Sequence, residues 1–470
     1  MIETLYKHPF SRVLALLLCL FLEGCAFSSM RLNDLAADLE AVPPEKILAK
    51  LKAVDYSDRD RVQYLLDYGV LKSLMGDFTG SIEDLQKAKQ IIQQLEAISI
   101  SENLGAVAVN DTLKSYVATP SEQMLLYELL AINYLMLGQV DAARVEVLQA
   151  QVKTRQFAET NEVNGRIASM EYLAGFIYEL LGEVDNAMIS YRNAANSLES
   201  KGMSTPVALQ DSLLRCSRWL GLHTEYKKYT SRFNRTASFP SKNQGEVTVI
   251  YWDGVVTAKK QRFLTVYVPQ LEHNVTIALP YYPDNNKRVN PLRLSVNGDS
   301  YYTGAIESVE KMAREDLDAQ STVIYTTALA RMVAKHMTIK ASQNQNNDNL
   351  TMLLNIASIF SEAADVRSWN MLPASIQAAT IQLAPGRYQL FSNQFTPISQ
   401  HTNANSLLDW FFTTDDKNVV ENSGATEHET TMIKQGVRPD QFTLDIKAGQ
   451  KVLLFVPRVS NRVYSTYLHN

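Results

Sequence analysis

Cysteine is scarce in this sequence, with only three among 470 residues. Cys19 and Cys25 belong to an N-terminal segment considered below, which leaves Cys216 alone, so no disulfide can form within the rest of the chain. Cys216 lies in the helical pattern SLLRCSRWL, with neither a base nor a second cysteine beside it. We therefore expect a small buried residue rather than a redox or nucleophilic group.

The motifs of several enzyme classes are also missing. The sequence has no HExxH, no cysteine pair at zinc spacing, no GxSxG and no GxxxxGK[ST] phosphate-binding loop. It has no basic stripe, and its formal net charge of −5 at pH 7 argues against nucleic acid as a partner. We expect no catalytic residue, metal site or cofactor, although carboxylates from distant positions could still meet in the fold.

Long hydrophobic runs are missing after the first 25 residues. Before that point, Lys7 and Arg12 accompany VLALLLCLFL, an apolar run typical of an export signal and shorter than the roughly 20 residues of a membrane-spanning helix. The run ends in LEGC at Cys25, which resembles a bacterial lipobox, although Glu23 is unusual there. The alternatives are an ordinary cleaved signal or an uncleaved anchor.

The lipobox resemblance implies a location in the cell. Residues 1–24 are expected to be a lipoprotein signal peptide, and Cys25 is expected to carry the lipid, palmitate included. Ala26, in place of an aspartate after the cysteine, resembles the pattern of lipoproteins sent to the outer membrane. The mature chain is therefore predicted to face the periplasm and to meet the membrane through its N-terminal lipid anchor.

A pattern of small and large residues recurs in the first half. The copies are LLDYGVLKSLMGDFTGSIEDLQKA, YELLAINYLMLGQVDAARVEVLQA and EYLAGFIYELLGEVDNAMISYRNA. Small residues let two antiparallel helices approach, and glycine permits the positive φ that ends the first helix. The matching positions are Gly69, Ala131 and Gly175; the turn glycines Gly76, Gly138 and Gly182; Ser81, Ala143 and Ala187; and the larger Leu85, Val147 and Tyr191.

This pattern resembles the tetratricopeptide repeat, so residues 25–240 are predicted to form a tetratricopeptide-like α-solenoid. A weaker copy around Gly221 is either a further unit or a closing helix pair. Two interpretations of the array remain open. Its concave face binds a peptide or protein, or the helices form a structural shell around the second half of the chain.

From Gly245 the pattern changes to the alternation of β-strands, in EVTVIYWDG, RFLTVYVP, NVTIALPYYP and RLSVNG. Helical periodicity returns from Ala305 to about Ala341 and again over 350–364. ATIQL and YQLF are predicted to form a hairpin with a type II turn at Pro385–Gly386. FTLDI, KVLLFVP and RVYSTYL are the last expected strands.

Residues 399–437 are polar and are predicted to be an insertion. Residues 245–470 are therefore predicted to form an α+β domain of small β-sheets and long helices. The fold class of the whole chain is α+β, with the helical repeat first and the mixed domain second.

The run EAADVRSWNMLPASI, residues 362–376, stands where a helix gives way to strands. With GEVTVIYWDG and ALARMVAKHM, it resembles a family of bacterial tetratricopeptide-containing envelope lipoproteins. The matching residues are Ala364, Asp365, Arg367, Ser368, Trp369, Leu372, Pro373, Pro385 and Gly386. The physical interpretation of Asp365, Arg367 and Trp369 is either a joint between the two halves or the lining of a binding cleft.

The resemblance implies no mechanism. Our hypothesis is a non-enzymatic scaffold whose helical repeat binds an envelope protein of unknown identity, with cell-wall synthesis or another multi-lipoprotein envelope complex as the favoured setting. One alternative is an envelope enzyme acting on glycan or peptide. Another is a structural subunit of an envelope ring assembly. A cleft lined by two carboxylates would favour the enzyme, and an extended groove without such a pair would favour binding.

Overall fold

A computed structural model describes much of the chain. The described residues are 32–54, 56–101, 115–159, 167–237, 243–269, 273–284, 289–343, 363–394, 440–459, 462–463 and 466–467. The predicted signal peptide with Cys25, the polar insertion at 399–437 and most of the predicted helix at 350–364 lie outside them. No helix within the described ranges is both long and apolar enough to cross a membrane.

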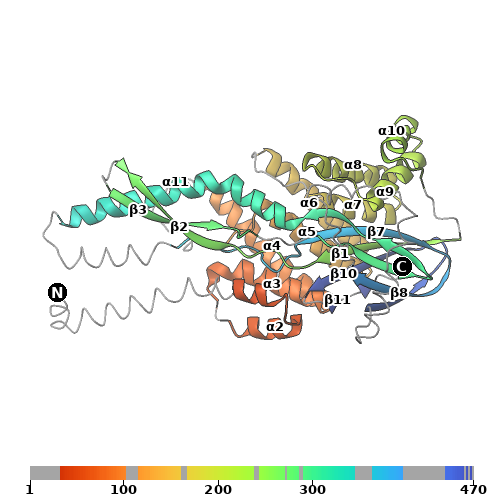
Figure 1. Ribbon diagram of the computed structural model, residues 1–470, viewed down its shortest axis with the longest axis horizontal. Coiled ribbons are helices and arrows are strands. Elements are labelled where there is room, and N and C mark those ends of the chain that lie inside the picture. Colours follow the sequence, from red (N-terminus) through yellow and green to blue (C-terminus); the bar gives the residue numbers. More distant parts are fainter. Residues whose placement is uncertain are drawn as a thin grey trace, which may run out of the picture.

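The first half consists of helices that pack in consecutive antiparallel pairs (Figure 1). A helix at 32–38 and α2 (Pro44–Lys52) precede the pairs. Each second helix also contacts the first helix of the next pair. The pairs are α3 (Arg61–Leu74) with α4 (Phe78–Ser101), α5 (Pro120–Met136) with α6 (Val140–Glu159), α7 (Ala168–Leu180) with α8 (Val184–Ser200), and α9 (Val207–Trp219) with α10 (His223–Phe233).

The repeated small residues lie where the paired helices touch. A Cβ atom added at Gly69 would lie 2.4 Å from Leu85 Cδ2, and one added at Gly175 would lie 2.4 Å from Tyr191 Cε1. The turn glycines predicted from the sequence all have positive φ, from 68° at Gly221 to 79° at Gly76. The predicted close approach and the predicted helix ends are therefore confirmed.

The second half contributes the strands, which form a mixed sheet, an antiparallel sheet and a separate hairpin. The mixed sheet has the order β11-β10-β1-β7-β6, with β12 also on β10. The antiparallel sheet has the order β5-β4-β8-β9, and β2 pairs with β3. The strands are β1 (Gly245–Asp253), β2 (Lys260–Val268), β3 (His273–Tyr281), β4 (Leu292–Val296), β5 (Asp299–Tyr302), β6 (Gly304–Ser308), β7 (Ser375–Leu383), β8 (Gly386–Gln394), β9 (Asp440–Ile446), β10 (Lys451–Val459), β11 (Arg462–Val463) and β12 (Thr466–Tyr467).

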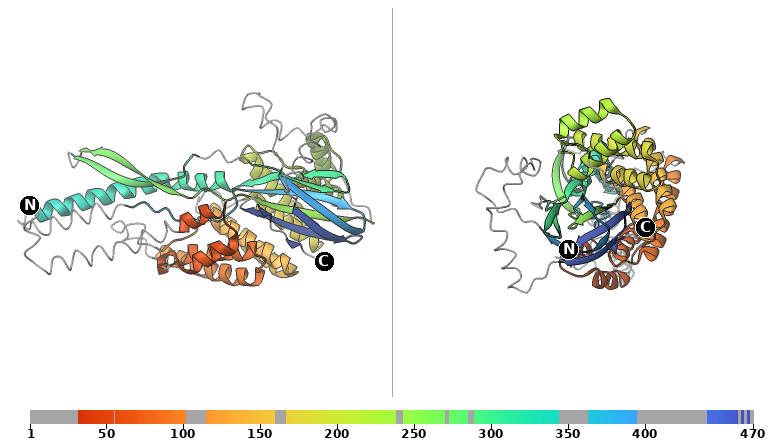
Figure 2. Two further views of the ribbon diagram at one scale, coloured as in Figure 1. Left: turned by 60° about the horizontal axis from the view of Figure 1, so that its bottom comes forward. Right: turned by 90° about the vertical axis from the view of Figure 1, so that its right-hand side faces the viewer.

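The mixed sheet lies between the helices and the antiparallel sheet. Alternate residues of a strand point to opposite faces, so Ile250 and Trp252 of β1 join the core with the helices, whereas Val249 and Tyr251 join the core with β4, β8 and β9. Every residue of β1 is therefore buried. In Figure 2 the helices form an arc around these strands. One apolar core thus runs across the predicted boundary near residue 240.

Two details differ from the sequence-based prediction. The turn at Pro385–Gly386 joins β7 of the mixed sheet to β8 of the antiparallel sheet, so the predicted hairpin is wrong. The reason is that β7 already pairs with β1 and β6 and has no free edge for β8. The helix expected from Ala305 begins at Val309 as α11 (Val309–Gln343), because Gly304–Ser308 pairs with β7 as strand β6.

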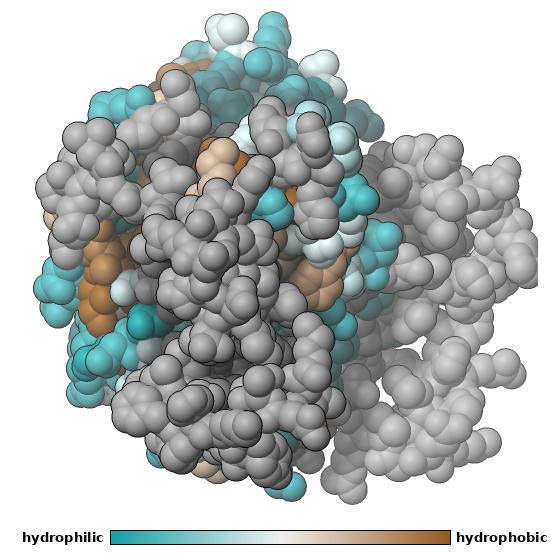
Figure 3. Space-filling model, turned by 90° about the vertical axis from the view of Figure 1, so that its left-hand side faces the viewer, coloured by the Kyte–Doolittle hydropathy of each residue, from teal (hydrophilic) through white to brown (hydrophobic). Residues whose placement is uncertain are grey.

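β2, β3 and α11 project together from the body, and we call them the arm (Figure 1). The arm exposes large apolar side chains to solvent. Figure 3 views the molecule from the side on which the arm projects and shows hydrophobic patches among hydrophilic residues. The exposed apolar side chains of the arm are Phe263, Leu264, Tyr267, Val323 and Met337.

Buried ion pairs connect the helices to the mixed sheet. Arg215 of α9 bonds to Glu179 of α7 at 2.8 Å and to Glu246 of β1 at 3.0 Å. Lys451 of β10 lies 2.6 Å from the same Glu179. Burial alone would raise the pKa of Glu179, but Arg215 and Lys451 outweigh it and lower that pKa to about 2. Glu179 therefore stays ionised in the core.

The contact between α3 and α4 gives a test of the close packing. We expect Gly69→Ala to lower the free energy of unfolding, because overpacking costs about 1–3 kcal/mol and alanine regains only roughly 0.5–1 kcal/mol over glycine in a helix. Adding Leu85→Val should recover most of the lost stability, because the smaller side chain makes room for the new methyl group. The next helix pair already has this combination, with Ala131 at the position of Gly69 and Val147 at the position of Leu85. Urea unfolding of both variants measures this. A Gly69→Ala variant as stable as the wild type would contradict the close contact.

Glu128 of α5 gives a pH-dependent prediction. Burial raises the pKa of Glu128 to about 8, although Ser169 Oγ donates a bond of 2.6 Å that opposes the increase, and Glu307 adds to it. The unfolded carboxyl ionises near its ordinary value of 4.5. Between these values the folded state binds more protons than the unfolded state, so the contribution of Glu128 to stability falls as pH rises.

The variant Glu128→Gln cannot ionise and should keep a partner for Ser169. The free energy of unfolding of the variant, minus that of the wild type, should therefore increase as pH is raised from 5 to 8. Urea titrations at both pH values measure the difference. A constant difference between the two proteins would mean that Glu128 is not a proton-binding group in the fold.

Candidate functional site

The run 366–370 lies between the helices of the first half and the strands of the second, and it is buried throughout. Its backbone is held from three different helices. The bonds run from Asn33 Nδ2 to the Val366 carbonyl (3.3 Å), from Gln63 Nε2 to the Ser368 carbonyl (2.8 Å) and from the Trp369 N–H to Glu122 Oε1 (2.7 Å). Asn370 Nδ2 also donates to Asn33 Oδ1. We call this run the joint.

Arg367 is the charged centre of the joint. Its Nε and Nη2 donate to the two carboxylate oxygens of Asp365 at 2.9 and 2.7 Å, and its Nη1 donates to Asp60 Oδ1 at 3.2 Å. The side chains of Arg367 and Asp60 are 4% and 6% exposed, whereas that of Asp365 is 30% exposed. The guanidinium also lies 5.9 Å from the ring centre of Tyr116. Removing Arg367 would leave Asp60 buried without this partner.

Glu122 is a central residue that the sequence-based analysis did not identify. It belongs to a capping box with Thr119 at the start of α5, and its Oε2 accepts from the Thr119 N–H at 2.7 Å and from Tyr116 Oη at 2.5 Å. Its other oxygen accepts from Trp369 N. The signal Thr-x-x-Glu predicts the cap. Nothing in one sequence points to the bond with Trp369, 247 residues away.

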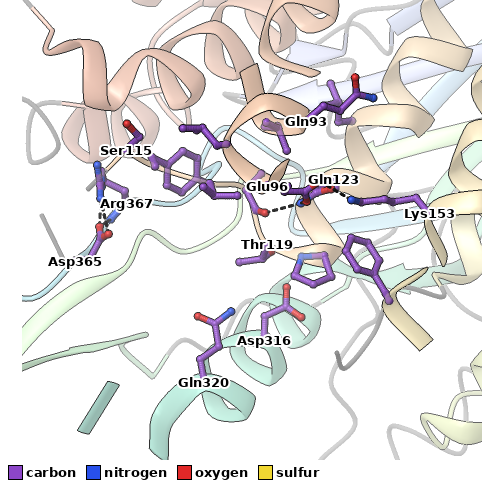
Figure 4. A pocket seen from close by; sticks show the side chains of 18 of the residues that line it. Gln93, Glu96, Ser115, Thr119, Gln123, Lys153, Asp316, Gln320, Asp365 and Arg367 are labelled. Carbon is purple, nitrogen blue, oxygen red and sulfur yellow. Dashed lines mark hydrogen bonds and ion pairs between the residues drawn. The ribbon is translucent and has the colours of Figure 1, made fainter. Parts of the chain in front are cut away.

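Beside the joint lies an open groove with a volume of about 1810 Å³. Its walls come from α4, α6 and α11, and its floor includes residues 115–120 at the start of α5. Figure 4 shows Asp365 and Arg367 at one end of the groove and Lys153 at the other, with Asp316 and Gln320 projecting from α11. Of the three residues named from the sequence, Asp365 and Arg367 line the groove, and Trp369 lies behind it.

The wall formed by α6 is apolar and exposed. Val145, Leu148 and Val152 lie on one helix face at positions i, i+3 and i+7 and are 49%, 38% and 47% exposed. Val323 of α11 also lines the groove and is 66% exposed. Apolar side chains gathered in one groove are typical of a surface that another molecule covers.

The remaining groove surface is polar but largely paired. Lys153 Nζ donates to Glu96 Oε2 at 2.6 Å, and Gln123 Nε2 donates to Glu96 Oε1 at 2.9 Å. Amide side chains dominate the rest, and they offer both donors and acceptors. The glutamines that line the groove are Gln86, Gln90, Gln93, Gln123, Gln149, Gln156 and Gln320.

Asp316 differs from the other groove carboxylates. Burial raises the pKa of Asp316 to about 6, although hydrogen bonds from Thr119 and Ser121 oppose the increase. The carboxylates of Glu96 and Asp365 are instead bonded to Lys153 and Arg367. Asp316 is therefore the groove carboxyl with a raised pKa.

The first helices of the pairs are covered by the second half of the chain. All residues of α5 from Ser121 to Asn133 and of α7 from Ala168 to Glu179 are buried. Ser121 donates to Asp316 of α11 at 2.9 Å, and the Ala168 N–H donates to Glu307 of β6 at 2.8 Å. This arrangement matches the interpretation of the helices as a shell. The open surface lies instead along the second helices α4 and α6.

Neither metal-binding clusters nor a reactive thiol emerge from the described residues. Within them, no group of three or more His, Cys, Asp or Glu side chains could hold a metal ion. Cys216 is buried, and its Sγ lies 3.3 Å from Glu179 Oε1. Burial, with the Glu179 carboxylate beside it, raises the pKa of the thiol, so Cys216 stays protonated.

Several solved structures resemble part of the chain, all at low TM-scores. MamA does so with a TM-score of 0.26 and 18% identity, over 40% of this chain and 85% of its own. The Rap conjugation gene regulator of plasmid pLS20, in complex with the Phr* peptide, has a TM-score of 0.26 and 13% identity over 40% and 45%. BtubC from P. vanneervenii has a TM-score of 0.27 and 15% identity over 40% and 68%.

No protein-family model matches the chain, and no curated protein matches it. Structural similarities with such low TM-scores decide neither the family nor the function.

The joint gives a direct test of the role of Arg367. We expect Arg367→Ala to lower the free energy of unfolding by about 3–5 kcal/mol, because breaking a buried ion pair leaves a charge without its partner. Asp365→Asn, at the more exposed partner, should cost at most about 1 kcal/mol. Thermal melting of both variants measures the difference. Unchanged melting of Arg367→Ala together with a lost envelope phenotype would show that Arg367 serves a binding cleft and not the joint.

Proposed function

We propose that this protein is a non-enzymatic scaffold that holds another protein of the bacterial cell envelope in the groove between α4, α6 and α11. The observation that carries the proposal is the exposed apolar face of α6 inside that groove, formed by Val145, Leu148 and Val152. A groove of about 1810 Å³ has room for a peptide segment. Apolar anchors at helical spacing and surrounding amides suit such a ligand.

The helical pairs are, in this proposal, tetratricopeptide-like repeats of an α-solenoid. The small residues at matching places, the glycine turns and the stacking of consecutive pairs support it. The resemblance of the Asp365–Pro373 run to envelope lipoproteins then favours a partner in cell-wall synthesis or another envelope complex. Lipidation at Cys25 would hold the groove at the periplasmic face of the outer membrane.

An envelope enzyme acting on glycan or peptide is the second candidate, and Asp316 is the observation that favours it. A carboxyl with a pKa of about 6 can act as a general acid. An acid–base mechanism also needs a second group close to Asp316. The carboxylates of Glu96 and Asp365 are already bonded to cations, and Glu159, the other groove carboxylate, is exposed at the last residue of α6. The scaffold therefore fits the groove better. A structural subunit of a ring assembly stays a third alternative, which large surfaces of contact between copies of the chain would favour.

The groove can be tested by photo-crosslinking in intact cells. A photoreactive amino acid at Val145 should give a discrete crosslinked complex, because the side chain is 49% exposed and faces the groove. Ile189 is the matched control, since it occupies the corresponding position of α8, is 51% exposed and lies outside the groove. Introducing Leu148→Glu beside Val145 should remove the complex, because it places a charge on the apolar face.

Gel shifts and mass spectrometry identify the crosslinked species. Equal crosslinking from Val145 and Ile189, or crosslinking from Val145 that survives Leu148→Glu, would count against the groove. If Asp316→Asn does not restore an envelope defect caused by deleting the gene, although its crosslinking is unchanged, the enzyme would be favoured instead.

A further inference from the structure

A small cavity lies at the inner side of the groove, next to the joint. Its volume is about 30 Å³, and its lining comes from the start of α5, from α11 and from residues 368–372. Thr119, Lys259 and Asp316 line both this cavity and the groove. Figure 4 shows Asp316 projecting from α11 towards Thr119 at this place. The cavity therefore adjoins the groove where α11 meets α5.

Three residues that line this cavity, Asp316, Ser368 and Trp369, each have a buried polar atom without a well-formed hydrogen bond. Asp316 Oδ2, Ser368 Oγ and Trp369 Nε1 are fully buried and make no hydrogen bond of good geometry among the described residues, with Thr119 close to the Asp316 carboxyl and Tyr282 close to the Ser368 hydroxyl. Tyr282 lines the same cavity beside Ser368. An unpaired buried polar atom costs about 1–3 kcal/mol, and most such atoms in folded proteins are paired with protein or water. Three of them around one small space indicate that something polar fills it.

We propose that this cavity binds one ordered water molecule, which accepts a hydrogen bond from Trp369 Nε1–H, donates one to Asp316 Oδ2 and shares a third with the Ser368 hydroxyl. A water needs roughly 10–15 Å³ and two to four polar partners, and the cavity provides both. The indole Nε1–H is a donor only, so it suits a water molecule, which can accept from it, and not a metal ion. Apolar cavities stay dry, but these three polar atoms make this one polar.

The water connects the groove to the joint. Asp316 faces the groove with part of its surface, and Trp369 is 1% exposed and belongs to the core shared by the two halves. The Asp316 carboxylate already bonds to Ser121 of α5 through Oδ1 at 2.9 Å. With the water on Oδ2, this one carboxylate ties α11 to α5 and to the joint. This role does not depend on what the groove binds.

The tryptophan indoles allow a direct test on the full chain. The sequence has only four tryptophans, so protein with ¹⁵N-labelled indoles gives few signals, and Trp369→Phe identifies that of Trp369. We expect magnetisation transfer from a long-lived water to the Trp369 Nε1–H in two-dimensional NMR. Absence of this transfer in the wild type would overturn the proposal.

Two substitutions of Ser368 form a matched pair. Ser368→Thr keeps the hydroxyl but adds a methyl group to the cavity, so it should displace the water and abolish the transfer. Ser368→Ala enlarges the cavity and should keep the water. Transfer that persists in Ser368→Thr would overturn the proposal, because the water would then reach the indole by another route.

A crystal structure of the wild type provides the second measurement, and it decides the matter should Ser368→Thr fail to fold. A density peak within hydrogen-bond distance of Asp316 Oδ2, Ser368 Oγ and Trp369 Nε1 supports the site. An empty cavity, or direct bonds between these groups and other protein atoms, contradicts it.

Discussion

The bond between the Trp369 N–H and Glu122 fixes the position of the two halves relative to each other. Glu122 also closes the capping box of α5 and accepts from Tyr116, so one carboxylate satisfies donors from Thr119 and Tyr116 just before α5 and from the joint. A buried carboxylate is costly unless it is hydrogen-bonded in this way. The arrangement is therefore stable only when the run 366–370 lies against the helices, which makes the joint a specific contact as well as an apolar one.

This contact determines which surface of the helices stays open for the proposed partner. Because the joint and the mixed sheet fill the inner side of the helical arc, α5 and α7 have no free face among the described residues. The exposed apolar surface is found instead on α6, opposite α11. The general form of a helical repeat would suggest the concave face, and here the chain itself occupies that face. The second half thus completes the helical array and shapes the groove.

The sequence predicts the local elements of this fold well and their long-range contacts poorly. Contacts between paired helices and the turns that end them are predicted correctly from Gly69, Gly76 and the matching residues of the next pairs. They can be predicted because residue spacing and the φ of a glycine are local properties. The pairing of β8 follows from the lack of a free edge on β7, which depends on strands far apart in the chain. Asp365, Arg367 and Trp369 are recognisable as unusual residues after a predicted helical pattern, whereas their partners Asp60 and Glu122 are not.

The same long-range contacts make the groove a pre-organised surface. Asp365 and Arg367 line one end of it while they hold the joint, and the floor includes Thr119, which caps α5 together with Glu122. The groove cannot change its shape at this end without breaking buried hydrogen bonds, each of which costs about 1–3 kcal/mol when a polar group is left unpaired. In the proposed function, a ligand meets walls that are already in place and has less ordering of the protein to offset. Specificity then depends on how well its side chains fit between Val145, Leu148 and α11.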